Sequence, residues 1–596
     1  MISPPQHSEE HPLREEVFKG LPTAPGIAIG KAHLYRHNSF IVTSRRVTSG
    51  QEEEWNALQK AIELTRYQLS ELKERLTPQV GESVSGIFDA QLMMLDDAAF
   101  FGEVKEAVLK EGLGAEWAVA QVLGKWRSEL LSHPDARLHQ RAQDLLDLCR
   151  RLVGNLNNQP SQFALPHEEG IILVADDLLP SDVMILLEGG VEGVVTEQGG
   201  STSHTAILTR ALQVPAVVGI SDLTAHIKSG DRVVVNGNSG KVILRPEPST
   251  LILYQEKREK YKAYLESLKD AVRLPAETKD GRRVALRANI ELPNEVHSAL
   301  SRGGEGVGLF RSEYLLLTRR RLPDEGEQEK VYRYILEKAY PHPVTIRTFD
   351  VGGDKLIPGV TTVNEPNPMV GWRAIRVGLE HPEILRTQLR AIFKASYYGK
   401  ARVMIPFVCG IEEVWEVKEH IQGVKEELRK EGVPFSDDVP LGIMVEIPSA
   451  AIMAEELAKE VSFFSIGTND LTQFLLAVDR GNPKVAERFQ PFHPALLRLI
   501  RDIAQSAHQI GIEVGICGEM AANPTATKLL VGLDIDELSV SPVALPEIKK
   551  LIRSISYREA RKMAEEALQC TTAKELHTFC WEAMKHRFAN FPIWFD

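Results

Sequence analysis

The sequence predicts a multidomain α/β protein that combines a (β/α)8 barrel with a second α/β domain, which is interrupted by an inserted α-helical domain. Its 596 residues exceed what one hydrophobic core supports, and this length suggests about three to four domains. The first half changes from strand-like to helical spacing of apolar residues and back again. The second half alternates short apolar segments with charged, helix-patterned ones.

The N-terminal half contains the interrupted domain. Residues 1–20 are polar and contain prolines, so we expect a flexible tail. A strand-like segment in 21–39 precedes apolar residues at helical spacing, which predict a helical domain over 40–160. Apolar, β-branched segments with glycine turns resume in 161–246, and we expect them to complete the domain begun by 21–39. A charged helix over 247–274 would then act as a linker.

The C-terminal half, residues 275–596, is predicted to form the barrel. Eight short apolar strands with intervening helices in a segment of this length are typical of the (β/α)8 fold. The strands are expected at residues 284–290, 306–310, 344–350, 402–408, 442–447, 463–468, 513–518 and 537–541.

Composition restricts the classes of function. The formal net charge of −12 argues against a general nucleic-acid or anionic-membrane binder. No apolar run approaches the roughly 20 residues that span a bilayer, and no secretory h-region is visible, so we expect a cytoplasmic protein. The cysteines lack CxxC spacing and are odd in number, which favours reduced thiols over disulfides or zinc ligands. They are Cys149, Cys409, Cys517, Cys570 and Cys580.

Polar side chains occur where the predicted barrel strands end, which is where the active site of a barrel lies. Guanidinium groups bind phosphate and carboxylate in a bidentate manner, and carboxylate oxygens are suitable ligands for Mg²⁺. Each residue alone is equally consistent with a structural ion pair, whereas the combination predicts a site for a small phosphorylated carboxylic acid and magnesium. The residues at strand ends are Arg311, Arg347, Glu446 and Asn469–Asp470, and those in the following loops and helices are Arg373 and Arg480.

The sequence leaves the chemistry of two further residues open. Cys517 in "GICGEMA" either packs in the barrel, delivers a proton or acts as a nucleophile from a strand end. His204 in "GGSTSHTAILTRAL" precedes a predicted helix, whose N-terminus favours an anion. This histidine is a core residue, a metal ligand or a phosphoryl acceptor, and the metal role is the weakest because partner ligands are missing.

Several long stretches resemble enzyme I of the bacterial phosphoenolpyruvate:sugar phosphotransferase system, and they occur in the order found in that family. They are "APGIAIGKA", "GGSTSHTAILTRALQVPAVVG", "GEGVGLFRSEYLL", "IRTFDVGGDK", "NPMVGWRAIR", "MVEIPSA", "FFSIGTNDLTQFLLAVDRGN" and "GICGEMA". The resemblance covers nearly the whole chain and implies a phosphoenolpyruvate–protein phosphotransferase that starts sugar uptake. It also implies a swivelling phosphohistidine domain, a helical domain that binds the carrier protein HPr, and a homodimer formed through the barrel.

The resemblance assigns roles to individual residues. His204 matches the histidine that takes the phosphoryl group of phosphoenolpyruvate and passes it to a histidine of HPr, and Cys517 matches the residue that protonates the enolate to give pyruvate. Glu446 and Asp470 match the Mg²⁺ ligands. The phosphoenolpyruvate-binding positions are matched by Arg311, Arg347, Asn469 and Arg480, with Arg373 as a further contributor.

The predicted helical domain contains a candidate HPr-docking patch in "DAQLMMLDD" at 89–97. Apolar side chains beside acids suit a basic partner face, but the same stretch is also typical of a helix core. The expected contacts are Leu92, Met93, Met94 and Asp96.

Two departures from the family pattern concern His204. Ser201 replaces the usual arginine of the "GGRTSHT" stretch, and "LLPSDV" places Leu179 and Val183 where the family often has threonines. A hydroxyl partner for the histidine would then come from another residue. The candidates are Thr202, Ser203 and Thr205.

Two other functions share these modules. Phosphoenolpyruvate synthase and pyruvate phosphate dikinase also have the histidine and barrel modules, but they need an ATP-grasp domain, and no nucleotide motif is evident here. A nitrogen-type regulatory paralogue of enzyme I usually carries an additional N-terminal sensory domain. This chain begins almost directly at "APGIAIGKA", which favours the sugar system.

Overall fold

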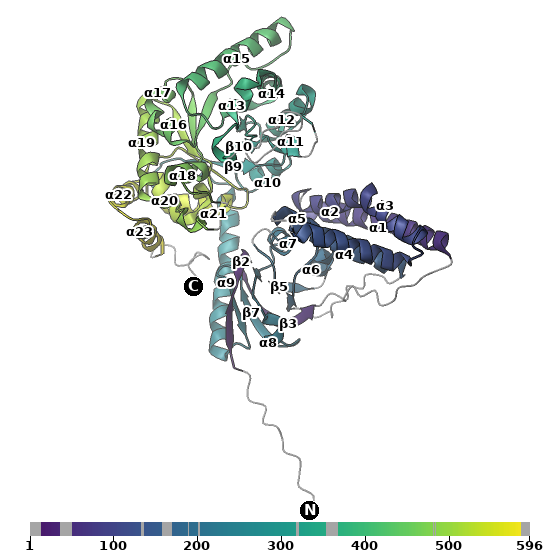
Figure 1. Cartoon of the computed structure of the whole chain (residues 1–596). Helices are drawn as coiled ribbons and strands as arrows, with labels where there is room; N and C mark the ends of the chain where they lie inside the picture. Colours follow the sequence, from purple (N-terminus) through teal and green to yellow (C-terminus); the bar gives the residue numbers. More distant parts are fainter. Residues whose placement is uncertain are drawn as a thin grey trace, which may run out of the picture. The chain divides into compact units, whose positions relative to one another are not determined.

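The computed structural model divides the chain into two compact units, the first ending at Tyr264 and the second beginning at Leu265. Each unit has its own sheet and core (Figure 1). The structure describes residues 14–35, 50–80, 82–132, 136–157, 170–188, 190–200, 203–317, 321–352, 367–480, 482 and 484–585.

An eight-stranded sheet forms the centre of the first unit. Strand β3 pairs in parallel with β4, although a long helical segment separates them in the sequence. The strands on either side of that segment therefore share one sheet. The flexible tail expected over 1–20 is wrong for Glu16–Lys19, which form a strand paired with β8, and residues 1–13 lie outside the described residues. The other domain boundaries stay predictions. In spatial order the strands are β1 (Glu16–Lys19), β8 (Lys241–Leu244), β7 (Arg232–Asn236), β3 (Ile27–Tyr35), β4 (Ile171–Ala175), β5 (Val191–Thr196), β6 (Ala216–Val218) and β2 (Leu21–Ala24).

The helical segment between β3 and β4 has its own apolar core. Each helix contributes apolar side chains to this core. Examples are Leu58, Phe100, Val119 and Cys149, which come from four different helices and are fully buried. Burial of such side chains contributes about 1.5–3 kcal/mol each. The helices are α1 (Gln51–Val80), α2 (Glu82–Leu95), α3 (Ala98–Leu109), α4 (Ala115–Ser132) and α5 (Ala136–Leu156).

Short helices follow the strands of the first sheet and carry the histidine segment. Helix α7 begins at His204, because Ser203 accepts a hydrogen bond from the Ala206 N–H and so caps the helix. Both α2 and α5 contact this part of the sheet domain, α2 at α7 and α5 at the short helix η1. The short helices are η1 (Pro180–Asp182), α6 (Val183–Glu188), α7 (His204–Ala211) and α8 (Leu223–His226).

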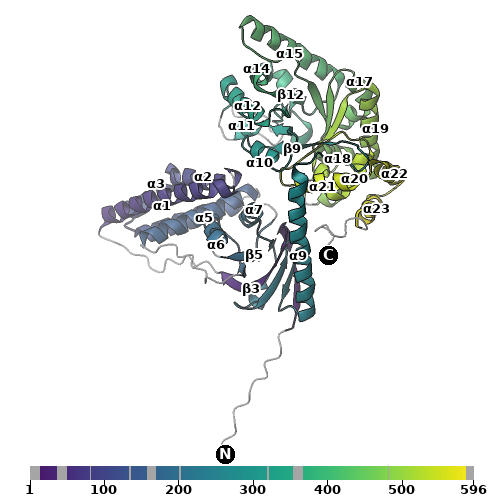
Figure 2. The ribbon, with the colours of Figure 1, turned by 180° about the vertical axis from the view of Figure 1, so that it is seen from behind.

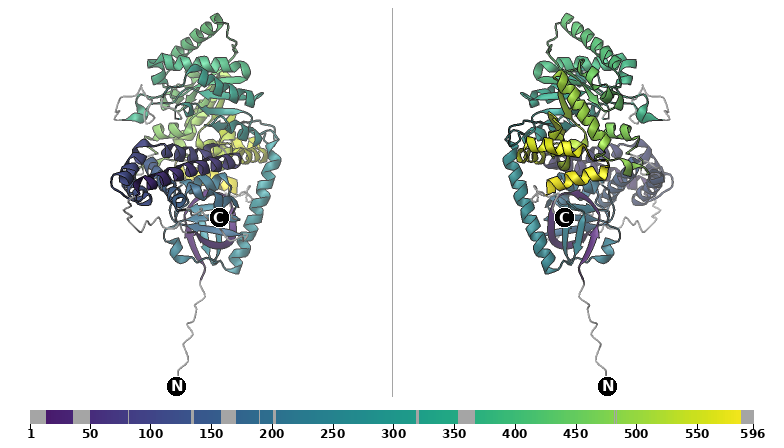
Figure 3. Two further views of the ribbon diagram at one scale, coloured as in Figure 1. Left: turned by 90° about the vertical axis from the view of Figure 1, so that its right-hand side faces the viewer. Right: turned by 90° about the vertical axis from the view of Figure 1, so that its left-hand side faces the viewer.

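A long helix, α9 (Pro248–Val272), occupies most of the predicted linker. Within the first unit, Tyr254 and Leu251 of this helix pack against Ile27 and Ile29 of the sheet. The first part of α9 lies beside the sheet in both views of Figure 3. Its last residue, Val272, is held in the second unit, where the Lys549 ammonium donates a hydrogen bond of 3.0 Å to the Val272 carbonyl.

The second unit is a closed barrel of eight parallel strands, as predicted from the alternation of strands and helices. Figure 2 shows the ring of strands and its outer helices from behind. In spatial order the strands are β10 (Val307–Arg311), β11 (Pro343–Arg347), β12 (Lys400–Ile405), β13 (Leu441–Val445), β14 (Phe463–Ile466), β15 (Glu513–Ile516), β16 (Glu537–Val540) and β9 (Ala285–Ile290).

Helices cover the outside of this barrel. They include the pair α20 and α22, which contact each other closely. The helices are α10 (Glu295–Ser301), α11 (Tyr314–Leu317), α12 (Glu325–Ala339), η2 (Pro368–Val370), α13 (Ile375–Glu380), α14 (Pro382–Ala395), η3 (Ser396–Tyr398), α15 (Ile411–Lys430), α16 (Pro448–Ile452), α17 (Ala454–Ala458), α18 (Thr468–Leu476), η4 (Ala486–Arg488), α19 (Pro494–Ile510), η5 (Glu519–Ala522), α20 (Pro524–Gly532), α21 (Leu545–Ser554), α22 (Tyr557–Ala567) and α23 (Ala573–Lys585).

Several predicted strands extend too far at their carboxyl ends, and the two with the largest difference are β11 and β12. Strand β11 ends at Arg347 rather than at residue 350, and β12 ends at Ile405 rather than at residue 408. Pro406 has no N–H for a ladder, and Phe407 has a left-handed φ of 62°. The chain leaves the barrel wall at these points and forms the loops of its mouth.

Charged side chains fill the barrel near the amino ends of the strands. Glu537 pairs with both Arg287 and Arg402, and the Arg402 guanidinium lies 3.8 Å from the centre of the Phe463 ring. This cluster closes the barrel at that end. The opposite, carboxyl ends of the strands are therefore where a substrate can bind.

Among the described residues, no helix combines the length and apolar character needed to cross a membrane.

Candidate active site

The barrel mouth brings together four of the charged residues predicted at the strand ends. Arg373 donates a hydrogen bond of 2.8 Å from Nη2 to Asp470 Oδ2. The charges of Arg347, Arg373 and Asp470 all act on Glu446, which follows β13. All four residues are buried, so these charges interact in a medium of lower dielectric than water.

Two buried carboxylates that the sequence analysis missed complete this cluster. Arg347 Nη2 lies 3.1 Å from Glu313 Oε2, and Arg347 Nη1 lies 3.3 Å from Asp350 Oδ2. Arg373 donates to both oxygens of Asp350, at 2.7 and 2.9 Å. Both acids stand within three residues of a predicted arginine in the sequence, so their position after a strand was the signal that could have found them.

The Glu446 carboxyl has an unusual environment. Burial raises its pKa to about 8, and the nearby negative charges of Asp470 and Asp350 act in the same direction. Its Oε1 atom accepts a hydrogen bond of 2.8 Å from the Phe407 N–H. The strained backbone of Phe407 therefore orients this carboxyl.

The remaining predicted binding residues lie at the more exposed rim of the mouth. Arg311, at the end of β10, pairs with the exposed Glu291. Asn469 and Glu519 exchange two hydrogen bonds, of 3.1 Å from the Asn469 amide and 3.0 Å from the Glu519 N–H. Arg480 Nη2 is 3.8 Å from Asp470 Oδ1, which connects the rim to the buried cluster.

Three buried polar atoms at the mouth have no hydrogen-bond partner within the described part of the chain. They are Nε of Arg347, Nη1 of Arg373 and Oγ1 of Thr468, the first residue of α18. Buried polar groups are normally paired, so unpaired donors at a strand end are expected where a ligand supplies the acceptor. Thr468 was not among the residues selected from the sequence.

Cys517 follows β15 and is buried in the same mouth. Its Sγ atom lies 3.7 Å from the Ile466 carbonyl oxygen, and the thiol packs among Leu309, Met404 and Met444. Burial raises the pKa of this thiol to about 11, so the sulfur is protonated at neutral pH. The charges of Glu446, Arg347 and Arg311 all act on it, which places the thiol near the charged cluster.

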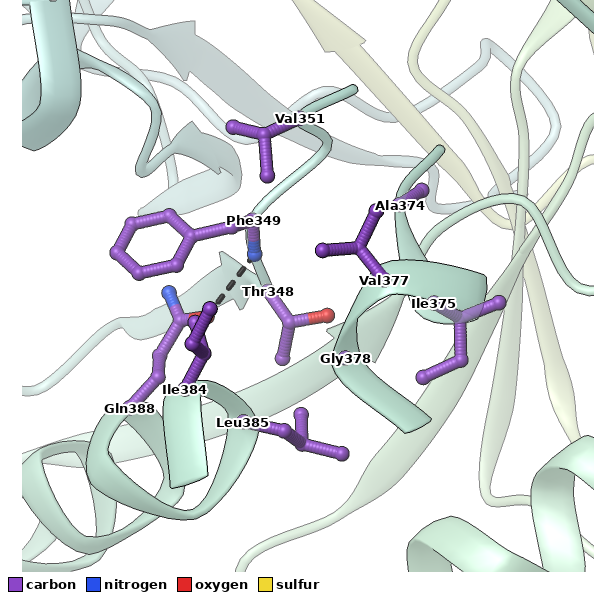
Figure 4. Close-up of a pocket in the computed structure, with 10 residues that line it drawn as sticks. All are labelled: Thr348, Phe349, Val351, Ala374, Ile375, Val377, Gly378, Ile384, Leu385 and Gln388. Carbon is purple, nitrogen blue, oxygen red and sulfur yellow. Dashed lines mark hydrogen bonds between the residues drawn. The ribbon is translucent and has the colours of Figure 1, made fainter. Parts of the chain in front are cut away.

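A small cavity of about 20 Å³ lies behind the loops that carry Asp350 and Arg373 (Figure 4). Its lining is mostly apolar, from Phe349 and Val351 to Leu385. This volume suits one water molecule and is too small for a phosphorylated acid. The cavity is therefore a packing feature of the loops, and the charged cluster is the candidate site.

His204 lies in the first unit, at the start of α7, and it is buried. Its Nε2 atom is 3.3 Å from Asp144 Oδ1 on α5. The two groups are close, but the geometry is not that of a hydrogen bond. Burial lowers the pKa of His204, although Asp177 and Asp147 oppose the shift. The imidazole is therefore neutral near pH 7 and able to act as a nucleophile.

Two of the three hydroxyl groups expected near His204, those of Ser203 and Thr205, make hydrogen bonds to other residues. Ser203 caps α7, and Thr205 Oγ1 donates a hydrogen bond of 2.9 Å to Asp177 Oδ1. Leu179 and Val183, which stand where the family often has threonines, are buried apolar side chains and offer no hydroxyl group. Ser201 and Thr202 lie outside the described residues.

Acidic side chains gather around the histidine where α5 meets the sheet domain. Asp147 accepts hydrogen bonds from Ser181 Oγ at 2.5 Å and from the Gln91 amide at 2.8 Å. Burial raises the pKa of Asp182 to about 7, and Asp147 contributes to the rise. This network could not be predicted from the sequence, because α5 and η1 are separate segments of the chain.

The predicted docking patch on α2 is divided between surface and core. Met93 and Asp96 are exposed, at 71 % and 66 %. Leu92 and Met94 are half-buried and pack against the core, so they are the part of the stretch that forms helix core. Asp96 also pairs with Arg66 of α1 at 2.8 Å.

A group of three or more His, Cys, Asp or Glu side chains placed to bind a metal does not occur among the described residues. Any metal at the barrel mouth would therefore need ligands from the substrate or water besides protein carboxylates.

Comparison with known proteins gives the same assignment along the whole chain. Residues 19–141, 167–240 and 265–557 match, in turn, the N-terminal, mobile and PEP-binding domains of PEP-utilising enzymes. The phosphoenolpyruvate-protein phosphotransferase of Geobacillus stearothermophilus is 38% identical over 567 residues, which cover 95% of this chain and 98% of that protein. The protein of the same name from Bacillus subtilis strain 168 is 39% identical and is covered completely.

A solution structure of Enzyme I (nEIt) is 36% identical, with 41% of this chain and 99% of that chain covered and a TM-score of 0.35. The full-length sequence similarity decides the assignment. The chain belongs to the phosphoenolpyruvate-protein phosphotransferase family, enzyme I, as its sequence motifs predicted.

Proposed function

We propose that this protein transfers the phosphoryl group of phosphoenolpyruvate to its own His204 and then to a histidine of HPr, and releases pyruvate. The observation that carries the proposal is the buried cluster at the barrel mouth, where Arg347 and Arg373 keep unpaired donor atoms. Phosphoryl transfer depends mainly on positioning and on neutralising charge, which guanidinium groups provide.

The arginines would bind the substrate through its phosphate and carboxylate. Arg347 and Arg373 lie inside the mouth, and Arg311, Asn469 and Arg480 lie at its rim. Salt bridges already hold the inner pair on one side, so their remaining N–H groups are available to an anion. This arrangement orients the phosphoryl group before transfer, which lowers the entropic part of the barrier.

The charge of the cluster supports a divalent cation. Four buried carboxyl groups, from Glu313, Asp350, Glu446 and Asp470, face two buried guanidiniums. Ionisation of all four would leave two negative charges in excess, and the raised pKa of Glu446 reflects its burial together with this excess. Arginine already occupies both oxygens of Asp350. Glu446 and Asp470 would therefore hold Mg²⁺, as oxygen ligands suit this ion. When bound, Mg²⁺ neutralises negative charge on the transferred phosphoryl group.

Cys517 would act as the general acid. Its thiol is protonated at neutral pH, so it can give its proton to the terminal carbon of the enolate left after phosphoryl transfer. The S–H bond breaks, a C–H bond forms, and the product is the keto form of pyruvate. The thiolate then regains a proton from water, which completes the cycle.

His204 would act as the phosphoryl acceptor. Its neutral ring attacks phosphorus while the bond between phosphorus and the enol oxygen breaks, so no separate base is needed. The described ring position places Nε2 at 3.3 Å from Asp144, which leaves no space for a phosphoryl group. The ring must therefore leave Asp144 and reach the barrel mouth, since it belongs to the other compact unit.

Transfer to HPr would use the surface of α2. Met93 is exposed beside the acidic Asp96, and Tyr67 of α1 is also exposed. An apolar contact next to acids suits a basic partner. We further infer a cytoplasmic homodimer joined through the barrel, acting at the first step of sugar uptake, with the nitrogen-type regulatory relay as the alternative.

Labelled phosphoenolpyruvate tests this function. With Mg²⁺ alone we expect an acid-labile label on the wild-type protein and none on His204→Ala, whereas His226→Ala, an exposed histidine of the same unit, should label normally. Adding HPr should move the label to HPr. An acid-stable label, or equal labelling of His204→Ala, would refute the proposal. Transfer to a nitrogen-type carrier in place of HPr would favour the regulatory branch.

A further inference from the structure

Asp350 lies at the centre of the charged cluster. It follows Arg347, the last residue of β11, by three positions. Only 2 % of its surface is exposed. Its carboxylate accepts two hydrogen bonds from Arg373, at 2.7 and 2.9 Å, and its Oδ2 lies 3.3 Å from Arg347 Nη1. One carboxylate therefore ties together two arginines that come from different loops of the barrel.

The backbone on both sides of Asp350 holds this arrangement. The Asp350 N–H donates a hydrogen bond of 2.6 Å to Glu313 Oε1, and Glu313 also pairs with Arg347. Gly352 forms an isolated bridge with Arg373, and the Ala374 N–H donates a hydrogen bond of 2.7 Å to the Val351 carbonyl. The loop after β11 and the segment that carries Arg373 are thus joined by main-chain as well as side-chain contacts.

Backbone strain marks the same place. Ala374 has φ 56° and ψ −121°, a conformation that non-glycine residues rarely adopt. A Cβ atom at Gly352 would lie 2.1 Å from the Trp372 carbonyl oxygen, so only glycine allows this approach. Strain of this kind persists where the surrounding contacts determine the geometry, and here those contacts converge on the Asp350–Arg373 pair.

The distribution of donors explains what this pairing achieves. Asp350 takes Nε and Nη2 of Arg373 and approaches Nη1 of Arg347, whereas Nη1 of Arg373 and Nε of Arg347 stay unpaired. Arg373 Nη2 also reaches Asp470. The carboxylate therefore fixes the orientation of each guanidinium plane and connects the arginines to a predicted magnesium ligand.

We propose that Asp350 is a positioning residue for phosphoenolpyruvate, because its buried carboxylate sets the relative orientation of Arg347 and Arg373. The proposal rests on the proposed function of the same site. Asp350 acts through the arginines and not on the reacting atoms, since Arg373 occupies both of its oxygens. Its loss should weaken substrate binding more than the chemical step.

The test compares HPr-dependent turnover of Asp350→Asn with that of the wild-type chain. The amide keeps the size of the side chain but presents N–H groups to the guanidiniums, so Arg373 loses a charge-assisted hydrogen bond and Arg347 loses an ion pair. We expect KM for phosphoenolpyruvate to rise about 10- to 100-fold, with a smaller change in kcat. An unchanged KM would overturn the proposal, whether or not kcat falls.

Two further variants separate positioning from folding. Asp536→Asn removes a carboxylate that pairs with Arg282 at 2.8 Å, on the loop before β16 at the opposite end of the barrel, and should leave KM unchanged. Asp350→Glu keeps the charge but displaces it by one methylene, so KM should rise less than in Asp350→Asn. If Asp350→Asn does not fold, an unchanged KM in Asp350→Glu overturns the proposal.

Failure of the inference and failure of the proposed function give different results. If the wild-type chain takes no acid-labile label from phosphoenolpyruvate, the function itself is wrong. If the wild-type chain labels and turns over normally while KM of both Asp350 variants matches it, only the role of Asp350 is wrong.

Discussion

Replacement of Asp144 by asparagine should stabilise the first unit above neutral pH. Asp144 lies on α5, only 6 % exposed, and its Oδ1 is 3.3 Å from His204 Nε2. Burial, reinforced by the negative charge of Asp147, raises the pKa of Asp144 from 3.8 to about 7. The folded chain therefore resists ionisation of a carboxyl group that ionises readily when unfolded.

The size and sign of the effect follow from linkage. A shift of about three pKa units corresponds to about 4 kcal/mol, because each unit is worth about 1.36 kcal/mol. Between pH 4 and 7 the unfolded chain has lost this proton and the folded chain has kept it, so stability falls as pH rises. The full loss is reached above the folded pKa. Asparagine does not titrate, so it removes this loss.

Hydrogen exchange of the full-length chain measures the difference. Amides of α7 and of β4 report on opening of the first unit, and barrel peptides provide an internal reference. At pH 8 we expect exchange in α7 to be slower in Asp144→Asn by up to about 10³-fold, while at pH 4 the two proteins should agree. Burial lowers the pKa of His204 in the wild-type chain, and the substitution leaves that burial in place, so the destabilisation by His204 at acidic pH should cancel in the comparison.

An exposed aspartate provides the control. Asp89→Asn changes a carboxylate on the surface of α2, so it should leave exchange in α7 unchanged at both pH values. The reasoning would be refuted if Asp144→Asn exchanged as fast as the wild-type chain at pH 8. It would also be refuted if the difference between the two proteins were the same at pH 4 and pH 8.

Three further predictions concern the barrel mouth. Cys517→Ala should slow pyruvate formation by about 10²- to 10⁴-fold in a stopped-flow assay, since it removes a general acid, while binding of phosphoenolpyruvate persists. Glu446→Gln should raise the Mg²⁺ concentration needed for half-maximal turnover by about tenfold or more, and an unchanged Mg²⁺ dependence would exclude this residue as a ligand. Gly518→Ala places a Cβ atom 1.9 Å from Thr468 Oγ1 and 2.8 Å from its N atom, so the start of α18 must shift. Calorimetry should show a loss of about 1–3 kcal/mol, and turnover should fall because Asp470 follows on the same helix.

The barrel could be predicted from the sequence because its signal is local and repeated. Each strand is a short apolar run, and each is followed by a charged helical segment, so eight repeats identify the fold without any long-range information. The ends of the strands were less predictable. Thr348 and Phe349 continue β11 with residue types that favour strands, and only the tertiary contacts of Asp350 show that this segment belongs to the mouth.

Some residues of the candidate site could also be predicted from the local sequence, and others could not. Arg347, Glu446 and Asp470 were found because they are polar side chains at or just after predicted strand ends, and Arg373 was found in the segment that follows the third predicted strand. Asp144 could not be found in this way. It is one of two acids on α5, and its contact with His204 joins positions 60 residues apart in the chain.

On α2, helical geometry decides which residues of the docking patch are exposed. Met93 and Asp96 lie on the outer face, three residues apart, as spacing on one helical face requires. Leu92 and Met94 flank Met93 in the sequence but point toward the core. Four consecutive residues of a helix point in different directions, so some side chains of this apolar run face the core and others face solvent.

In the proposed function, the acidic side chains around His204 would keep the phosphorylated ring from returning to its position beside Asp144. A phosphoryl group on Nε2 adds volume and negative charge where Asp144 already lies at 3.3 Å, with Asp147 and Asp177 acting on the same ring. The loaded ring is therefore repelled from the position that the unloaded ring occupies. The barrel mouth offers the opposite environment, since Arg347 and Arg373 have donors to spare. Under the proposed function, loading at the mouth and exclusion from the acidic pocket would together leave the phosphohistidine exposed to a partner until it gives up its phosphoryl group, and only then would the ring return to Asp144.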